Sequence, residues 1–131
     1  MTHTLHTRVW YEDTDLGGIV YYANYLKFIE RGRSAMIEAA GIDQLALREE
    51  GYVLAVRRVE ADYLLPARYG DALTIHTGLR ALTAARAVLD QQVRRGSDDA
   101  LLFTARVTIV CLRTDGRPVR LPGALRAALT G

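Results

Sequence analysis

Apolar and polar positions alternate near the start of the chain and then change to a helical period. The alternation over residues 4–11 is typical of a β-strand. The face of this strand that is expected to be buried contains Leu5, Thr7, Val9 and Tyr11. From about residue 22 to residue 40, residues suited to burial recur every three or four positions, which predicts one long amphipathic helix. These residues are Tyr25, Phe28, Ile29, Gly32, Met36, Ala39 and Ala40.

A short second helix and four strands are expected after the long helix. Gly41 is suited to end the long helix, and Asp43 to cap a second one that runs to about Glu49. Strand patterns follow over residues 53–65, 72–80, 86–95 and 101–112, and residues 124–129 form a final helical turn. No helical pattern separates the four later strands, so we expect them to pair antiparallel through short turns. The pattern therefore predicts an α+β fold.

Composition places the chain among single-domain proteins, with residues 1–131 forming one domain. Half of the residues are apolar, and the net charge of +2 is too small to indicate a nucleic-acid partner. Lys27 is the only lysine beside many arginines, which suits phosphate or carboxylate binding but also fits a genome-wide bias. The start of the chain does not resemble a signal peptide, and no stretch is long enough to insert in a membrane. We therefore expect a cytoplasmic protein.

Common catalytic constellations are missing from the sequence. The three histidines, His3, His6 and His76, are scattered, and no spacing resembles a metal site. There is no G-x-S-x-G motif and no glycine-rich phosphate loop. Cys111 lies in an apolar run and is predicted to be a buried apolar residue rather than a nucleophile. No cofactor is expected.

The segment DTDLGGIVYYAN, residues 13–24, contains the most informative chemistry. Two aspartates and two glycines precede an apolar run and the predicted helix. The start of a helix presents unpaired N–H groups that can polarise a carbonyl, and a nearby carboxylate can act as a base or nucleophile. Turns and helix caps are the alternative interpretation of the same residues, and the spacing alone leaves both open.

This segment resembles the signature of the hotdog thioesterases, through its D-x-D-x-x-G-x-V-x-x-x-N string. It is similar to the 4-hydroxybenzoyl-CoA thioesterase family and, more closely, to the Tol-Pal-associated acyl-CoA thioesterases. The likeness extends to FIERGR at residue 28, VRRV at residue 56, YLLPARYGD at residue 63 and PVRLP at residue 118. The resemblance implies a hotdog fold, in which a five-stranded antiparallel sheet wraps around one long central helix. It also implies hydrolysis of short-chain aliphatic or aromatic acyl-CoA.

The resemblance also assigns roles to particular residues. It implies that Asp15 is the catalytic carboxylate and that the Tyr22 backbone N–H polarises the thioester carbonyl. Asp13 is expected to order the loop. Substrate contacts are expected from Gly18, Val20, Tyr21 and Asn24.

Coenzyme A is expected to bind basic and hydroxyl side chains on the sheet. The candidates are Thr83 and Arg86, with Arg58 and Arg57 as weaker ones, although an arginine on a strand is often only solvated. The resemblance further implies a homodimer or homotetramer, built from sheets joined edge to edge with the active sites at the interface.

One residue departs from the closer relatives, because Tyr22 stands where many Tol-Pal-associated thioesterases have histidine. A backbone N–H donor survives this change, whereas a side-chain acid–base role would not. A hotdog dehydratase is a weaker alternative, because it relies on a histidine and none lies between His6 and His76. A binding or scaffold protein for acyl-CoA or acyl carrier protein, serving the Tol-Pal envelope system, is the alternative without turnover.

Overall fold

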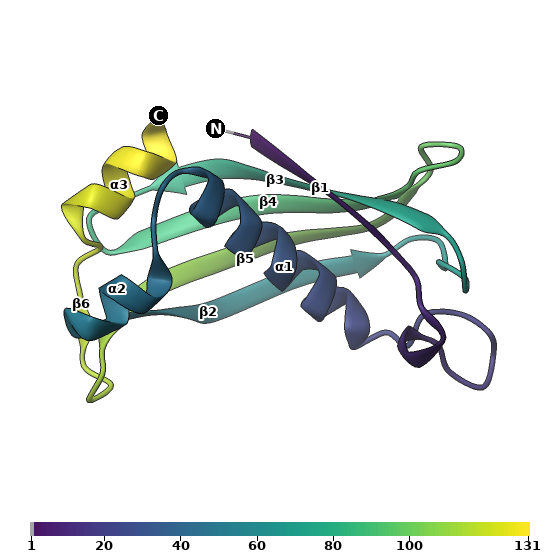
Figure 1. The fold of residues 1–131 in the computed structure, drawn as a ribbon, viewed down its shortest axis with the longest axis horizontal. Helices are drawn as coiled ribbons and strands as arrows, with labels where there is room; N and C mark the ends of the chain where they lie inside the picture. Colours follow the sequence, from purple (N-terminus) through teal and green to yellow (C-terminus); the bar gives the residue numbers. More distant parts are fainter. Residues whose placement is uncertain (1) are drawn as a thin grey trace.

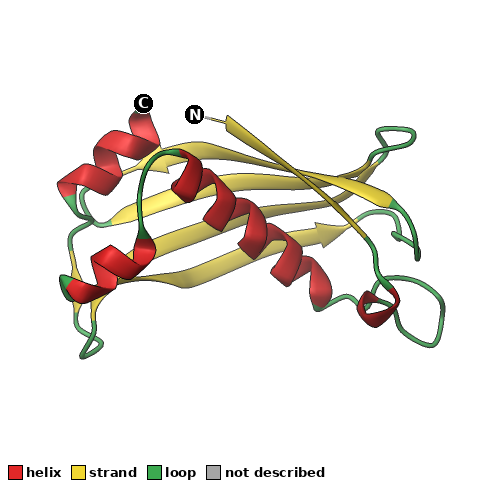
Figure 2. Ribbon diagram, in the orientation of Figure 1, coloured by secondary structure: helices red, strands yellow, loops and turns green. Residues whose placement is uncertain are grey.

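The computed structural model describes residues 2–131, and its largest element is an antiparallel sheet with the strand order β1-β3-β4-β5-β2 (Figure 1). The strands are β1 (Thr2–Arg8), β2 (Tyr52–Tyr63), β3 (Ala72–Leu82), β4 (Arg86–Arg95), β5 (Leu101–Arg113) and the short β6 (Pro118–Val119), which pairs with β5. The helices are α1 (Asn24–Ala39), α2 (Gln44–Glu49) and α3 (Gly123–Thr130) (Figure 2). The predicted α+β class and the five main strands are confirmed, and β6 lies in the segment between Pro118 and Pro122, which the two prolines predict to be short and extended.

The first strand is shorter than the alternation predicts, because β1 ends at Arg8 and not at Tyr11. The chain turns into a single 3-10 turn over Tyr11–Asp13. The Asp13 carboxylate accepts a hydrogen bond from the Trp10 N–H at 2.9 Å, and the Asp13 N–H donates to the Trp10 carbonyl at 3.0 Å. These two local bonds replace the pairing that a longer strand would make, and they leave the Tyr11 side chain exposed.

The core lies between helix α1 and one face of the sheet, which the helix crosses in Figure 1. The predicted positions Tyr25, Phe28, Ile29, Gly32 and Met36 are buried, whereas Ala39 is exposed because the helix ends there. Cys111 is fully buried, as predicted, and burial raises the pKa of its thiol. None of the helices described in residues 2–131 is long and apolar enough to cross a membrane.

A buried polar network fixes helix α1 on the sheet. The Gln91 side-chain N–H donates to the Ile29 carbonyl at 2.8 Å and to the Thr77 hydroxyl at 2.9 Å. The Gln91 carbonyl oxygen accepts a bond from Arg33 Nη1 at 3.0 Å, and burial lowers the pKa of that arginine. Gly32 lies over the same spot, where the absence of a side chain lets the helix approach the strands closely. Because these bonds are directional, they hold the helix in one position along its axis.

Strand β2 forms one edge of the sheet, and its residues 56–63 are exposed. Val56 and Val59 are 47% and 39% exposed, which is unusual for β-branched residues on a strand. A register shift between Val56 and Arg58 marks a bulge in the pairing with β5. An open edge with apolar side chains is a surface that pairs readily with another strand.

Candidate active site

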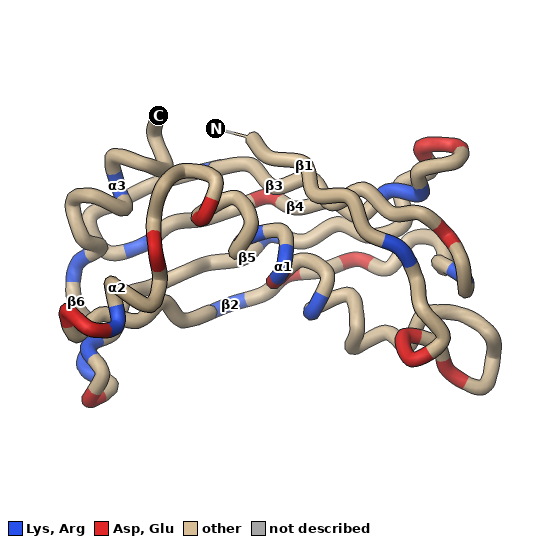
Figure 3. The backbone as a smooth tube through the Cα atoms, in the orientation of Figure 1, with Lys and Arg blue, Asp and Glu red and all other residues tan. Residues whose placement is uncertain are grey.

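The loop that follows the 3-10 turn folds back on itself and presents Asp15. The Asp15 N–H donates to the Ile19 carbonyl at 2.9 Å, and the Gly18 N–H donates to the Asp15 carbonyl at 3.0 Å. Gly18 has a φ of 77°, in the left-handed region that favours glycine, so this tight reversal depends on the residue. Acidic residues mark the loop in Figure 3. The reversal holds the backbone of Asp15 while its side chain stays exposed.

The two aspartates of this loop differ in their surroundings. Asp13 is buried, and its carbonyl accepts hydrogen bonds from the Tyr21 N–H and from Asn24 Nδ2, both at 2.9 Å. Asp15 is exposed, and its Oδ1 accepts one bond from the Gly17 N–H at 2.9 Å. Asp13 therefore joins the loop to the start of helix α1, whereas Asp15 has a carboxylate that water and a ligand can reach.

Helix α1 begins beside this loop. The Asn24 N–H donates to the Tyr21 carbonyl at 2.9 Å, and the Leu26 N–H donates to the Ala23 carbonyl at 3.2 Å. In the described part of the chain, no side chain caps the helix and the Tyr22 N–H has no protein acceptor. An unpaired N–H at the positive end of a helix dipole is suited to bind a carbonyl oxygen or an oxyanion.

An apolar cavity of about 350 Å³ opens between the helix start and the end of β2. Its lining residues are Ile19, Val20, Tyr22, Tyr25, Tyr63, Leu64, Leu65 and Pro66. Val20 is almost fully buried, and its N–H donates to the Ala67 carbonyl at 2.9 Å. Tyr21 lies outside the lining, with its ring 5.0 Å from that of Tyr22 and 45% of its side chain exposed. The cavity is suited to hold a small apolar group beside Tyr22.

Tyr63 links the edge strand to the helix start, and sequence reasoning gave it no role. Its hydroxyl donates to the Tyr22 carbonyl at 3.1 Å, and its ring lies 5.0 Å from that of Phe103 and 5.5 Å from that of Tyr25. Burial, and secondarily the neighbouring Tyr22, raise the pKa of Tyr63, so the hydroxyl keeps the proton that it donates. In the sequence, Tyr63 is visible only as an aromatic residue before Leu64-Leu65-Pro66. Its hydrogen-bond partner, Tyr22, lies 41 positions away in the chain, so the pattern does not reveal the contact.

The residues predicted to bind coenzyme A lie away from Asp15 in this chain. The Thr83 hydroxyl accepts hydrogen bonds from the Ala85 and Arg86 N–H groups at 3.2 and 3.1 Å, and thereby shapes the turn between β3 and β4. That turn is separated by the length of β3 from the end of the sheet next to Asp15, because β3 begins at the loop that contacts Val20. Arg58 is exposed on the edge strand, where its Nη2 lies 3.0 Å from a Glu60 carboxylate oxygen. Arg57 is exposed at the bulge of the same strand.

The structure thus brings Asp15, Gly18, Val20, Tyr21, Tyr22 and Asn24 together at one end of helix α1, and leaves Thr83, Arg86 and Arg58 apart from them. Within residues 2–131, no three His, Cys, Asp or Glu side chains gather closely enough to hold a metal ion. One chain therefore contains an exposed carboxylate, a backbone N–H without a protein acceptor and an apolar cavity at the same end of helix α1.

Comparison with known proteins gives one consistent result. Residues 9–129 match the thioesterase-like superfamily. The chain is 38% identical over 105 residues to the acyl-CoA thioester hydrolase YbgC of Escherichia coli, covering 80% of this chain and 78% of that protein.

Solved structures agree with the sequence match. A probable thioesterase from Bartonella henselae is 36% identical, with a TM-score of 0.88 over 93% of this chain and 100% of that one. A 4-hydroxybenzoyl CoA thioesterase mutant, in complex with 4-hydroxybenzoyl CoA, shares the fold with a TM-score of 0.90, 24% identity and 98% coverage of both chains. The hotdog fold expected from the sequence is therefore confirmed.

Proposed function

Because the chain belongs to the thioesterase-like superfamily, we propose that it hydrolyses acyl-CoA thioesters to free coenzyme A and a carboxylic acid. The observation that carries this proposal is the juxtaposition of the exposed Asp15 carboxylate, the unpaired Tyr22 N–H and the apolar cavity. A thioester is already an activated acyl group, so a carboxylate and a carbonyl-polarising N–H support its hydrolysis.

In the proposed reaction the thioester carbonyl accepts a hydrogen bond from the Tyr22 N–H. Asp15 either removes a proton from the attacking water or attacks the carbonyl itself, giving an anhydride that water then cleaves. The negative charge that develops on the carbonyl oxygen is stabilised by the N–H and the helix dipole. The carbon–sulfur bond breaks, and coenzyme A leaves as the thiolate and takes up a proton.

The surrounding residues support this geometry. Gly18 lets the substrate approach the loop backbone, and Asn24 keeps the loop against the helix through its bond to the Asp13 carbonyl. Val20 lines the cavity for the acyl group, and the Tyr21 ring packs at a tilt against that of Tyr22. A cavity of about 350 Å³ suits a short aliphatic or a single-ring aromatic acyl group.

We propose a homodimer in which the β2 edges of two protomers pair antiparallel. A two-fold axis at this edge would place the end of one sheet that is remote from Asp15 beside the end of the other sheet that lies next to Asp15. Thr83 and Arg86 of the second protomer then approach the site of the first, and can bind the coenzyme A phosphates together with Arg58. A dimer of such dimers would give the tetramer. Light scattering tests the assembly, and a monomer at micromolar concentration would contradict it.

Two finer parts of the proposal concern biological context. The residue 13–24 segment resembles the Tol-Pal-associated thioesterases, and we propose membership of that subgroup, with Tyr22 in place of its common histidine. A cytoplasmic location follows from the substrate, because acyl-CoA thioesters are made and used inside the cell. Acyl carrier protein is the alternative acyl donor.

Substitution of Asp15 by Asn tests the catalytic proposal. The variant keeps the shape of the side chain and removes the base or nucleophile, so kcat is expected to fall at least about 100-fold while acyl-CoA binding persists. Glu12→Gln is the matched control, because Glu12 is an exposed carboxylate three residues away in the adjoining turn. Thiol release is measured with acetyl-, butyryl-, benzoyl- and 4-hydroxybenzoyl-CoA, and binding by calorimetry.

The outcomes separate the candidate functions. Equal turnover by the wild type and Asp15→Asn would refute the role of Asp15. Binding of acyl-CoA or acyl carrier protein with no turnover above background would refute the enzyme and favour the scaffold protein of the Tol-Pal system.

A further inference from the structure

The loop between β2 and β3, residues 64–71, contacts the cavity, helix α1 and the segment that follows Asp15. Its first residues, Leu64, Leu65 and Pro66, form one wall of the cavity. Its Ala67 N–H donates to the Tyr25 hydroxyl at 3.1 Å. The Ala67 carbonyl accepts the Val20 N–H at 2.9 Å, and an adjoining bridge pairs Ile19 with Arg68. The position of this loop therefore determines the width of the cavity. It also determines where the backbone that follows Asp15 is held.

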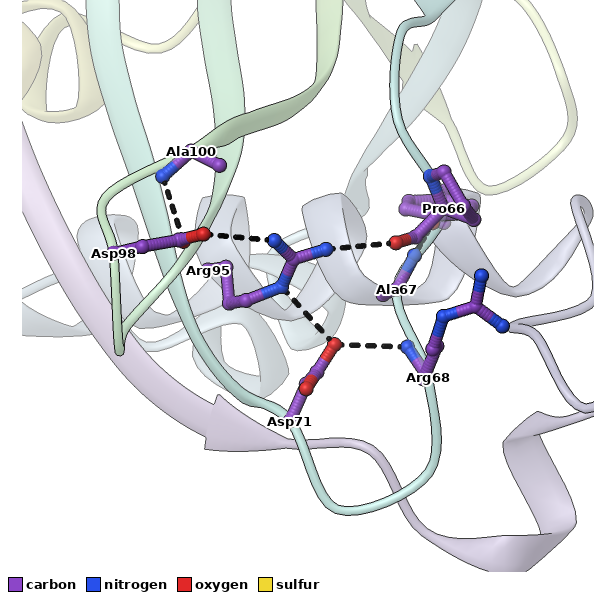
Figure 4. A network of polar contacts seen from close by, with 8 residues as sticks. Pro66, Ala67, Arg68, Asp71, Arg95, Asp98 and Ala100 are labelled. Atoms are coloured by element: carbon purple, nitrogen blue, oxygen red, sulfur yellow. Dashed lines mark hydrogen bonds and ion pairs between the residues drawn. The ribbon is translucent and has the colours of Figure 1, made fainter.

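One side chain outside the site fastens this loop to the body of the sheet. Arg95, the last residue of β4, donates from Nη2 to the Pro66 carbonyl at 3.0 Å (Figure 4). Its Nε donates to Asp71 Oδ2 at 3.3 Å, and its Nη1 donates to Asp98 Oδ2 at 3.0 Å. The three nitrogens of the guanidinium thus bind both ends of the 64–71 loop, at Pro66 and Asp71, and the turn after β4, at Asp98.

The carboxylate partners of Arg95 are themselves held by the backbone. Asp71 Oδ2 accepts the Arg68 N–H at 2.9 Å, which closes the loop on itself, and Asp98 Oδ1 accepts the Ala100 N–H at 3.1 Å (Figure 4). The Arg95 side chain is only 21% exposed, and the hydrogen bond to Asp98, with further help from Asp71, raises its pKa. The planar fork of arginine suits this arrangement, whereas a lysine ammonium is a single point that cannot reach all three partners.

We propose that Arg95 is a positioning residue that sets the acyl selectivity of the site through residues 64–71. It touches neither the reacting atoms nor the acyl group. It holds Pro66 and Asp71, so the cavity wall stays in place and Ala67 keeps its bonds to Tyr25 and Val20. The inference rests on the proposed thioesterase activity for its kinetic consequence, and on the hydrogen bonds alone for its structural one.

Arg95→Lys, compared with Arg94→Lys, tests the proposal. Arg94 is the neighbouring residue on the same strand, and its guanidinium contacts Gln92 and Asp99 instead of the 64–71 loop. Both variants keep the charge and make the same chemical change. For Arg95→Lys we expect kcat/KM with benzoyl-CoA to fall about tenfold, mainly through KM, and with acetyl-CoA to stay within about threefold. An acetyl group is too small to depend on the cavity wall, and Arg94→Lys should change neither value.

Hydrogen exchange gives a second measurement that does not require turnover. The Ala67 and Val20 amides should exchange at least about fivefold faster in Arg95→Lys than in Arg94→Lys or the wild type. Unchanged exchange at these amides would overturn the inference even if the enzyme is active. An equal loss of kcat/KM for both substrates would also overturn it, because that result describes general destabilisation. If the wild type shows no turnover but amide exchange still differs between Arg95→Lys and Arg94→Lys, the thioesterase proposal and the selectivity role of Arg95 are both refuted. Arg95 would then act only in holding the loop in place.

Discussion

Replacing Gly32 by alanine should destabilise the protein, although alanine favours helices. A Cβ at this position would lie 2.7 Å from Ile75 Cγ2, 3.0 Å from Thr77 Oγ1 and 3.2 Å from Gln91 Nε2. Ile75 is fully buried and branched at Cβ, so its methyl group cannot swing aside. The helix must therefore move away from the sheet, which lengthens the hydrogen bonds that Gln91 makes to it.

The size of the effect follows from two costs and one opposing gain. Overpacking a well-filled core costs about 1–3 kcal/mol. The gain in helix propensity from glycine to alanine is about 1 kcal/mol. A weakened Gln91 hydrogen bond, worth about 1 kcal/mol, adds to the cost. We expect the free energy of unfolding to fall by about 1–3 kcal/mol in total, a large share of the usual stability of a domain.

Urea denaturation followed by circular dichroism measures this change, at one fixed protein concentration because oligomer assembly contributes to stability. Ile75→Ala supplies the partner for a double-mutant cycle, since it removes the obstructing methyl group. The loss of unfolding free energy in the double variant should be smaller, by about 1 kcal/mol, than the sum of the losses in the two single variants. A neutral or stabilising Gly32→Ala, or strict additivity of the pair, would refute the close-contact argument.

Two further predictions concern the Tyr63 hydroxyl and the Asp98 carboxylate. Tyr63→Phe removes the hydroxyl that donates to the Tyr22 carbonyl, so kcat should fall about three- to tenfold with little change in KM; an unchanged kcat would show that this bond does not hold the helix start. The backbone N–H of Ala100, with further help from Arg95, lowers the pKa of Asp98 below its ordinary 3.8. Its contribution to stability is therefore complete above that value and is lost as the pH falls through the lower folded-state pKa. Between pH 5 and pH 2, the urea midpoint should fall less for Asp98→Asn than for the wild type. Parallel curves of midpoint against pH for the two proteins would contradict this assignment.

The elements of the fold were predictable where one face of the chain meets the core. The alternation in β3 and the three-to-four spacing in α1 reflect burial directly, so their existence and order follow from the sequence. The end of β1 was predicted wrongly, because the alternation continues to Tyr11 while the Asp13 carboxylate captures the Trp10 N–H. A local side-chain bond of this kind competes with strand pairing and leaves no periodic signal.

The candidate site was predictable where its residues are close in the chain. Asp15 and Tyr22 stand in one segment, and the loop reversal at Gly18 brings them to the same end of α1. Tyr63 and Arg95 were not predictable, because their roles depend on which strand ends meet, and that follows from the sheet order. Thr83 and Arg86 were predicted from the sequence to lie at the site, but within one chain the fold does not bring them near Asp15.

The cavity wall has a consequence for how the acyl preference of such a protein can evolve. Leu64 and Leu65 are 49% and 50% exposed, whereas the residues that fix the sheet and helix, such as Gln91, are almost fully buried. Substitutions at half-exposed positions usually change the free energy of unfolding little. Mutation at Leu64 and Leu65 can therefore reshape this wall of the cavity while the scaffold keeps its stability. Val20 and Tyr25 also line the cavity but belong to the buried core, so the half-exposed part of the lining is the part that can change in this way.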